Sequence, residues 1–556
     1  MLPPHHFVMS LSLGGICPMG ATLRAIRALV LLAGFYLLGV LLLAALAGID
    51  YALYAFDAPS SLAAKLYIVS VLLAIPVVRG MFMLRTPRDE GMHGLHVTEA
   101  DEPRLWHTVR ELAEQVGTRA PAEIVLTGDV NAAVTENARF LGLLPGKRRL
   151  YLGVPLMQGL SEAQLRAVLC HELGHYSNSD TRLAAITVRG RAQVLRTIRH
   201  FEERAAKTAG RERDRQEKKA AKATAKGKQA REIDTGRAGI TYRTMARLYT
   251  GYAKLYFRAT LAGSRRQEYA ADLASARIAG RDATASALRE IPALDAAHDF
   301  YMQSYATLGA PAGLLPPRGE VFGGFGHLLS ARALELAEMR TELPTEPTSP
   351  YDSHPPIAER VRRIEALPAD GRTDEAKGAA LGLLAHPERT LAALEEAVLT
   401  EEARALRRTA DWQELLDGSM GSRLAGLDSP LHRALAMYTQ DTPTLPALLQ
   451  IIDEGRLWKL AQRLPLSDEA AAANGRAFRE FVRPVLRTSL SNMALAKLGS
   501  RGLLRWEFSW AEAATVHLPR AADGTEADLD GAVDAAIADV PDTAPLRALL
   551  ASSRTS

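Results

Sequence analysis

Cysteine is scarce in this sequence, whose 556 residues include only Cys17 and Cys170. A secreted chain of this size often carries a disulfide framework, so two cysteines agree with a reducing compartment. No apolar stretch precedes Cys17, and we do not interpret it as a site of lipid attachment. Cys170 lies in a helical pattern and is predicted to be a buried helix residue, with thiolate chemistry and metal binding as the alternatives.

Charge is absent from residues 28–49, an uninterrupted apolar stretch. It is long enough for the ~20 residues that a membrane-spanning helix requires. A second apolar segment, 66–84, contains Pro76 and Arg79, so a reentrant or interfacial helix is the alternative to a second span. A cleaved signal peptide competes for the first stretch, but that stretch is longer than a usual signal h-region. The sequence therefore favours a retained membrane anchor.

Basic residues flank the two apolar segments and predict their orientation. Arg24 and Arg27 precede the first segment, and Arg85 and Arg88 follow the second. The loop between them has a single lysine against two aspartates. Because cytoplasmic flanks carry the excess of Lys and Arg, both ends of this hairpin are predicted to be cytoplasmic. The chain is thus expected to be a multi-pass protein of the cytoplasmic membrane, with its catalytic part facing the cytoplasm and the lipid bilayer as a partner.

Large apolar residues are almost missing from 204–231, where eleven Lys or Arg stand against three acidic residues. Such a run cannot bury a core and is either a solvated helix or a disordered insertion. Binding of nucleic acid is not expected, because no base-reading module accompanies the run. The following segment, 242–257, interleaves aromatic with basic residues. It is predicted to be a core-packing helix with a solvated face, the alternative being a helix that lies on anionic lipid headgroups.

The most informative motif is H-E-x-x-H, formed by His171, Glu172 and His175. Residues four apart share one face of a helix, so both imidazoles can reach one metal ion while Glu172 projects beside a bound water. Ser161 and Gln164 form a capping box upstream, which predicts that the motif lies inside a properly started helix. This pattern is typical of a zinc hydrolase.

A catalytic zinc site of this kind needs a third protein ligand and an open position for water. Glu268 is the best candidate, because it lies four residues before Asp272 in an Ala-rich helical run. One carboxylate could bind the metal while the other orients a ligand histidine through its second ring nitrogen. The alternative is that both are ordinary surface acids beside Arg265 and Arg266.

Three short strands are predicted upstream of the motif, at 123–127, 130–134 and 149–153. An extended peptide could add to an exposed strand edge near Asn131 and present a carbonyl to the metal. A turn residue after Asp129 is an equally weighted interpretation of Asn131.

Four motifs in order resemble the HtpX-like membrane zinc metallopeptidases, which include the CAAX prenyl endopeptidases. They are His-Glu-Leu-Gly-His at 171–175, Glu-Tyr-Ala-Ala-Asp at 268–272, Ser-His-Pro-Pro with downstream arginines at 353–367, and Asn-Ala-Ala at 131–133. The resemblance covers roughly 60–367. The basic run lies where this family commonly has further membrane spans, which is the clearest departure from its pattern.

The resemblance implies one zinc ion per chain, bound by His171, His175 and Glu268, with Glu172 as general base and acid. It implies contacts of His354 and Arg360 with the substrate or the oxyanion, although a histidine before Pro-Pro is otherwise a loop residue. Asn131, Ala132 and Ala133 correspond to the family's Asn-Ala-aromatic sequence on an edge strand, and Asp272 is expected to support the ligands. A polypeptide is the implied substrate.

After residue 367 the composition turns to Ala, Leu, Glu and Arg with helical periodicity, without a catalytic motif or a repeat. We therefore predict an α+β, predominantly helical protein in three parts. These are a membrane anchor at 1–88, a zincin-like metallopeptidase domain with a small sheet at 89–367 and a basic insertion at about 203–234, and a helical domain at 368–556. The four tryptophans of this last part are expected in its core or at an interface.

The predicted function is that of a membrane-anchored zinc endopeptidase, which the resemblance links to membrane-protein quality control or to processing of one partner. The alternative is a catalytically idle scaffold that keeps zinc for structure and acts through its helical extension. The intact Glu172 argues against the scaffold, because a purely structural zinc site does not need that carboxylate.

Overall fold

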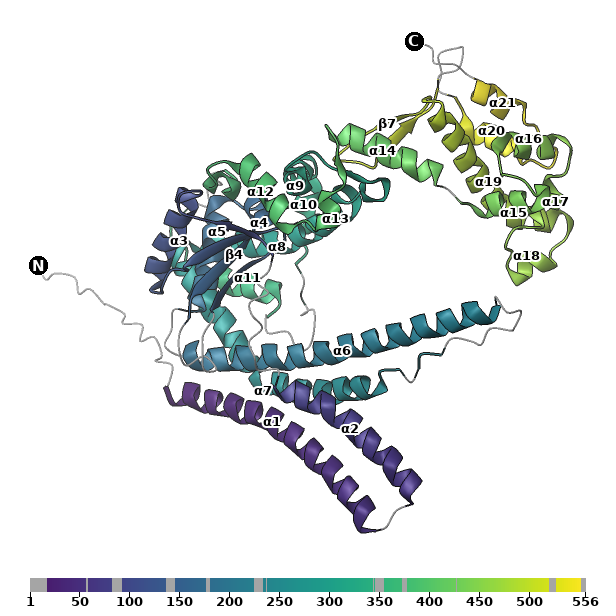
Figure 1. The fold of residues 1–556 in the computed structure, drawn as a ribbon. Helices are drawn as coiled ribbons and strands as arrows, with labels where there is room; N and C mark the ends of the chain where they lie inside the picture. The colour runs from purple at the N-terminus through teal and green to yellow at the C-terminus, as the bar shows by residue number, and fades with distance from the viewer. Residues whose placement is uncertain are drawn as a thin grey trace, which may run out of the picture. The chain divides into compact units, whose positions relative to one another are not determined.

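The structure is a computed structural model of the whole chain. It describes residues 18–56, 59–82, 93–136, 146–176, 181–224, 234–236, 238–343, 345, 355–372, 378–426, 428–519 and 527–551. Cys17 and His354 lie outside these residues. The fold is mostly helical with small sheets, in agreement with the predicted class (Figure 1).

The chain divides into two compact units that interleave in sequence. One comprises Met1–Pro292 with Arg340–Ala385, and the other Ala293–Met339 with His386–Ser556. The three-part division expected from the sequence stays a prediction.

The first unit contains a four-stranded sheet. Its strands are β1 (Leu95–Val97), β2 (Glu123–Thr127), β3 (Ala132–Glu136) and β4 (Arg148–Gly153), in the spatial order β1-β2-β4-β3. β2 and β4 are parallel, while the two outer strands pair antiparallel with them. The predicted strands at 123–127 and 149–153 match β2 and β4 to within one residue. β3 begins two residues later than predicted, because Asn131 precedes the strand in a tight turn in which its N–H donates to the carbonyl of Asp129.

Gly153 ends β4 at a point where the turn before β3 comes very close. A Cβ atom on this residue would lie 1.8 Å from the carbonyl oxygen of Asp129. Only glycine allows this approach. The close contact fixes the start of the edge strand β3.

Helices surround the sheet in the first unit. They are α3 (Pro103–Val116), α4 (Val154–Gly159), α5 (Glu162–Gly174), α11 (Ile357–Glu365) and the first part of α8 (Arg281–Tyr301). α3 begins with proline and ends at Gly117, whose φ of 76° forms a left-handed C-cap. Its Trp106 donates to the carbonyl of Val97 on β1.

Four long helices of the first unit pack around an apolar core of their own. They are α1 (Pro18–Ala55), α2 (Ser60–Phe82), α6 (Thr181–Thr224) and α7 (Ile240–Ile278). Phe201 of α6 and Tyr249 and Tyr256 of α7 are fully buried in this core. The prediction that 242–257 packs on a core is therefore confirmed.

α1 and α2 lie side by side, and Ser70 donates to the Asp50 carboxylate across a distance of 2.8 Å. Within the described residues, Tyr36–Ala55 is the one segment long and apolar enough to cross a membrane, and the apolar part of α2 is limited to Ala63–Ile75. The two-span hairpin stays a prediction. Of the side chains in the predicted second span, those of Pro76 and Arg79 are not described.

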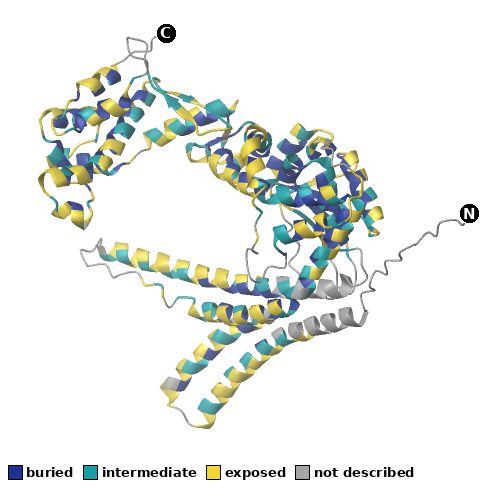
Figure 2. Cartoon of the chain, turned by 180° about the vertical axis from the view of Figure 1, so that it is seen from behind, coloured by how far each residue is buried: buried dark blue, intermediate teal, exposed yellow. Residues whose placement is uncertain are grey.

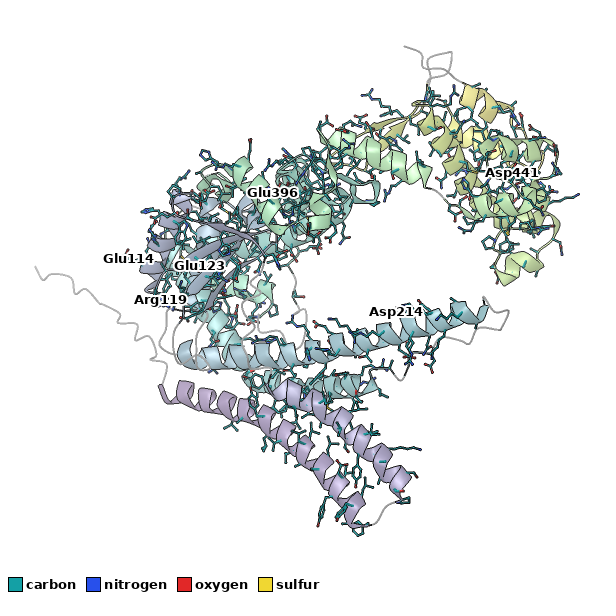
Figure 3. All side chains as sticks on the ribbon, viewed as in Figure 1. Glu114, Arg119, Glu123, Asp214, Glu396 and Asp441 are labelled. Atoms are coloured by element: carbon teal, nitrogen blue, oxygen red, sulfur yellow. The ribbon has the colours of Figure 1, made fainter. Side chains whose placement is uncertain are left out.

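The basic run is helical as far as Thr224, the end of α6. Most of its residues are exposed, and Figure 2 shows this half of the helix as largely solvent-facing. Charged side chains surround Asp214 along this helix in Figure 3. A solvated helix is thus the correct alternative for 204–224, while 225–233 lie outside the described residues.

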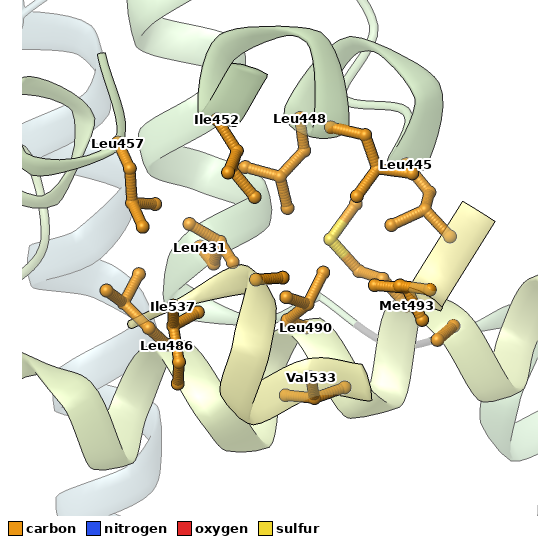
Figure 4. Packing of buried hydrophobic residues seen from close by; sticks show 14 of the residues in the cluster. Leu431, Leu445, Leu448, Ile452, Leu457, Leu486, Leu490, Met493, Val533 and Ile537 are labelled. Atoms are coloured by element: carbon orange, nitrogen blue, oxygen red, sulfur yellow. The ribbon is translucent and has the colours of Figure 1, made fainter. Parts of the chain in front are cut away.

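The second unit is helical, with two short two-stranded sheets. Its main core gathers leucine, isoleucine and valine side chains from several helices. Figure 4 shows Leu431, Leu448, Ile452, Leu490 and Val533 converging in it. The helices of this unit after residue 386 are α12 (Pro387–Val398), α13 (Glu401–Arg404), α14 (Trp412–Ala425), α15 (Pro430–Thr439), α16 (Leu445–Asp453), α17 (Leu457–Ala461), α18 (Asp468–Ala472), α19 (Gly475–Ser500), α20 (Leu529–Ala536) and α21 (Ala544–Ala551).

Replacement of Leu448 by alanine should destabilise the second unit. This side chain is fully buried, and removing a buried leucine typically costs about 2–5 kcal/mol through lost burial and the cavity left behind. Leu334→Ala is the matched control, because Leu334 of the same unit is 85 % exposed. Four of the five tryptophans lie in this unit, so tryptophan fluorescence during urea denaturation reports on it. Equal transition midpoints for the two variants would contradict the packing described.

Candidate metal centre

Helix α5 presents His171 and Glu172 from its last turn and His175 from its C-cap. The predicted capping box is confirmed, because Ser161 accepts from the Gln164 backbone N–H and the Gln164 side chain accepts from the Ser161 N–H. Leu173, between the histidines, faces the core and is buried. The two imidazole rings are nearly perpendicular, with 3.2 Å between their Nε2 atoms. The helix therefore directs both ring nitrogens to one point.

Helix α7 brings two carboxylates to this point by packing closely on α5. Gly174 lies against α7, since a Cβ atom on it would be in van der Waals contact with the Cα of Ala271 at 3.4 Å. Ser275, one turn further along α7, donates to the carbonyl of Ala167 in α5 at 2.7 Å. Both contacts hold Glu268 and Asp272 against the motif helix.

Glu268 lies opposite both histidines. Its carboxylate oxygens are 3.6 Å from Nε2 of His171 and 3.7 Å from Nε2 of His175. Ligands held tetrahedrally at the usual zinc distances lie about 3.3–3.4 Å from one another. The three residues therefore fit one zinc ion as a donor set, in both chemistry and spacing. Glu172 belongs to the same cluster, whose ligand atoms with the two histidines lie within 4.8 Å of one another.

Asp272 contacts the other ring nitrogen of His171. The distance between Oδ1 and Nδ1 is 3.0 Å, and an accepting carboxylate at Nδ1 leaves Nε2 free of its proton to bind a metal. Burial lowers the pKa of His171, but the hydrogen bonds to Asp272 and Glu268 outweigh it and raise the pKa to about 9. The site thus favours positive charge.

Arg360 of α11 holds Asp272 in place. Its Nε and Nη2 donate to the two carboxylate oxygens at 2.9 and 2.6 Å. Burial raises the pKa of Asp272, yet the bonds from His171 and Arg360 more than compensate and keep it below its usual range. Glu268 and Asp272 are only 6 and 3 % exposed, so the alternative that they are ordinary surface acids is wrong. Arg360 is buried with them, at 7 % exposed. The contact of Arg360 with Asp272 was not predicted, since nothing in the sequence tells which residue Arg360 contacts.

The remaining predicted site residues have different outcomes. His354 lies outside the described residues, and its role stays a prediction, as does substrate contact by Arg360. Asn131 precedes β3, while Ala132 and Ala133 begin that edge strand. Cys170 is buried, and burial raises the pKa of its thiol to about 12, which agrees with the predicted helix-core role.

Two histidines from H-E-x-x-H and a glutamate from a second helix are the donor set that catalytic zinc sites of metallopeptidases use. Residues 99–367 match the profile described as Peptidase family M48. A Protease HtpX homolog from Kineococcus radiotolerans is 29 % identical over 280 residues, which cover 50 % of this chain and 77 % of that protein.

A second Protease HtpX homolog, from Sulfurihydrogenibium sp., is 25 % identical over 270 residues, covering 48 % of this chain and 75 % of the relative. A third homolog, from Tropheryma whipplei, is 31 % identical over 90 residues, which cover 16 % of this chain and 29 % of that protein. No solved structure matches the chain. Residues 99–367 thus match peptidase family M48, and the chain is similar to HtpX homologues, which confirms the predicted resemblance.

Asp272→Asn should weaken zinc binding about 10–100-fold, because removal of a partner that orients a ligand histidine has that effect in zinc sites. The chain is stripped of metal and titrated with zinc against a chromophoric chelator. Asp299→Asn, at an exposed position of α8, is the control and should bind zinc as the unmodified chain does. Equal zinc affinity in both variants would refute the orienting role of Asp272.

Proposed function

We propose that this chain is a membrane-anchored, zinc-dependent endopeptidase. The observation that carries the proposal is the convergence of His171, His175 and Glu268 at tetrahedral ligand spacing, with Glu172 in the same cluster. His171, His175 and Glu268 would hold one zinc ion. When bound, zinc supplies Lewis acidity, which lets water lose a proton near neutral pH.

Glu172 is the proposed general base and acid. Its carboxylate accepts a proton from the water that attacks the peptide carbonyl, and it returns that proton to the leaving amine. Asp272, backed by Arg360, keeps His171 in the orientation that leaves Nε2 available. His354 is the proposed donor to the oxyanion.

The proposed substrate is a polypeptide segment that can be extended. β3 is the last strand of its sheet, and its outer side has no strand partner among the described residues. Because the Asn131 carbonyl accepts from the N–H of Gly153, the alternation of an antiparallel strand turns the N–H and C=O of Ala132 outward. A peptide strand added there would pair with the backbone, so selection would depend little on side chains. Such breadth suits membrane-protein quality control, and processing of one partner is the narrower form of the same activity.

Glu172→Gln should abolish peptide cleavage while zinc binding persists. Loss of a general base costs about 10²–10⁴ in rate, and the amide keeps the size of the side chain. Cleavage of casein and of a fluorogenic peptide by detergent-solubilised protein is compared with zinc content. Glu162→Gln, in the first turn of the same helix, is the matched control and should cleave normally. Stoichiometric zinc without activity in the unmodified chain would instead favour the scaffold.

The proposed location is the cytoplasmic membrane, in a multi-pass topology with the metal centre on the cytoplasmic side. Two single-cysteine variants in a Cys17→Ser background test it, because Cys170 is buried. Phe56→Cys lies in the loop after α1 and should react with a membrane-impermeant maleimide in sealed right-side-out vesicles. Lys219→Cys, exposed on α6, should react only after the vesicles are opened. Labelling of Lys219→Cys in sealed vesicles would contradict the proposed cytoplasmic orientation and indicate the opposite one.

A further inference from the structure

The outer side of β3 offers few backbone groups to an added strand. Residues that pair with β4 through hydrogen bonds alternate with residues whose N–H and C=O face away from it. The bond from the Gly153 N–H to the Asn131 carbonyl fixes this alternation. Ala132 and Val134 therefore provide successive outward pairing positions, about 7 Å apart along the strand.

Tyr176 already occupies the second of these positions. Its hydroxyl donates to the carbonyl oxygen of Val134 at 2.7 Å. Tyr176 immediately follows His175, the C-cap of α5. Its side chain therefore links the Val134 carbonyl to the end of the helix that carries both histidines. A substrate strand that extended past Ala132 would have to compete with this hydroxyl for Val134.

Tyr176 is held in this position at its ring and at its backbone carbonyl. The Arg148 guanidinium lies over its ring, 4.7 Å from the centroid. The Thr118 hydroxyl donates to the backbone carbonyl of Tyr176 at 3.0 Å. Arg148 in turn donates to the Thr118 hydroxyl at 2.7 Å. Arg148 is itself largely buried. The contact between Tyr176 and Val134 is therefore built into the fold of α3, β4 and α5, and it is not a chance contact of a surface side chain.

We propose that Tyr176 is a specificity-determining residue that ends the substrate-pairing edge of β3 at Ala132. The inference rests on the proposed function, since it requires peptide addition to β3. Its consequence is a substrate that is extended over a short stretch only. Beyond Ala132 the peptide is free to leave the strand direction, so the segment cleaved need not come from a long β-strand.

The test compares peptide binding by Tyr176 and Tyr176→Phe chains, both in a zinc-loaded Glu172→Gln background that prevents cleavage. Phenylalanine keeps the ring under Arg148 and removes only the hydroxyl. The probes are a fluorescent decapeptide that the unmodified chain cleaves and analogues in which one backbone amide at a time is N-methylated. Dissociation constants come from fluorescence anisotropy in detergent. An N-methyl group removes one donor and reports which peptide amides bond to the edge.

With Tyr176 in place, N-methylation should weaken binding at the amide that donates to the Ala132 carbonyl. In Tyr176→Phe, a second amide two residues along the peptide should become sensitive, by about fivefold for one hydrogen bond. Tyr305→Phe is the control, because it removes a hydroxyl that donates to the backbone carbonyl of Ser509 in the other unit. Its profile should match that of the Tyr176 chain.

Two results would overturn the inference and are distinguishable. Identical profiles for the Tyr176 and Tyr176→Phe chains, each with one sensitive amide, would leave strand addition intact and remove Tyr176 from it. Absence of any sensitive amide in both chains would remove strand addition to β3 itself. Melting temperature and zinc content of each variant establish that the compared proteins are folded and loaded.

Discussion

The close packing of α5 on α7 is the contact on which the metal centre depends. Gly174 lies against Ala271 of α7, and Ser275 donates to the carbonyl of Ala167 in α5. Glu268 reaches both histidines, and Asp272 reaches His171, because the two helices pack closely at this point. The inner residues of the motif therefore have packing roles: Leu173 is buried in the core, and Gly174 contacts the second helix.

The same helix α7 also belongs to the apolar core formed with α1, α2 and α6. Tyr256 is buried in that core, and Glu268 follows twelve residues later, about 18 Å along an uninterrupted helix. Glu268, the proposed third ligand, thus belongs to a continuous helix whose other part packs against the apolar N-terminal helices. The basic continuation of α6 extends from this core as a solvated helix, which explains how a highly charged sequence is accommodated there.

Local patterns predicted the parts of the site, and long-range packing decided how they meet. Helical spacing and the capping box placed His171 and His175 on one face, and the spacing of Glu268 and Asp272 did the same for α7. The bidentate contact of Arg360 with Asp272 joins residues 88 positions apart, which no local pattern reveals. The contact of Tyr176 with Val134 was hidden for the same reason. The start of β3 was displaced because a turn at Asp129 uses the Asn131 backbone.

The most direct test of the α5–α7 metal centre is X-ray absorption spectroscopy at the zinc edge on the purified, zinc-quantified chain. One zinc per chain, with two imidazoles and oxygen donors at about 2.0–2.2 Å, is the predicted result. A sulfur shell at about 2.3 Å would place a cysteine on the metal. Either that shell or absence of zinc would contradict the assignment of His171, His175 and Glu268.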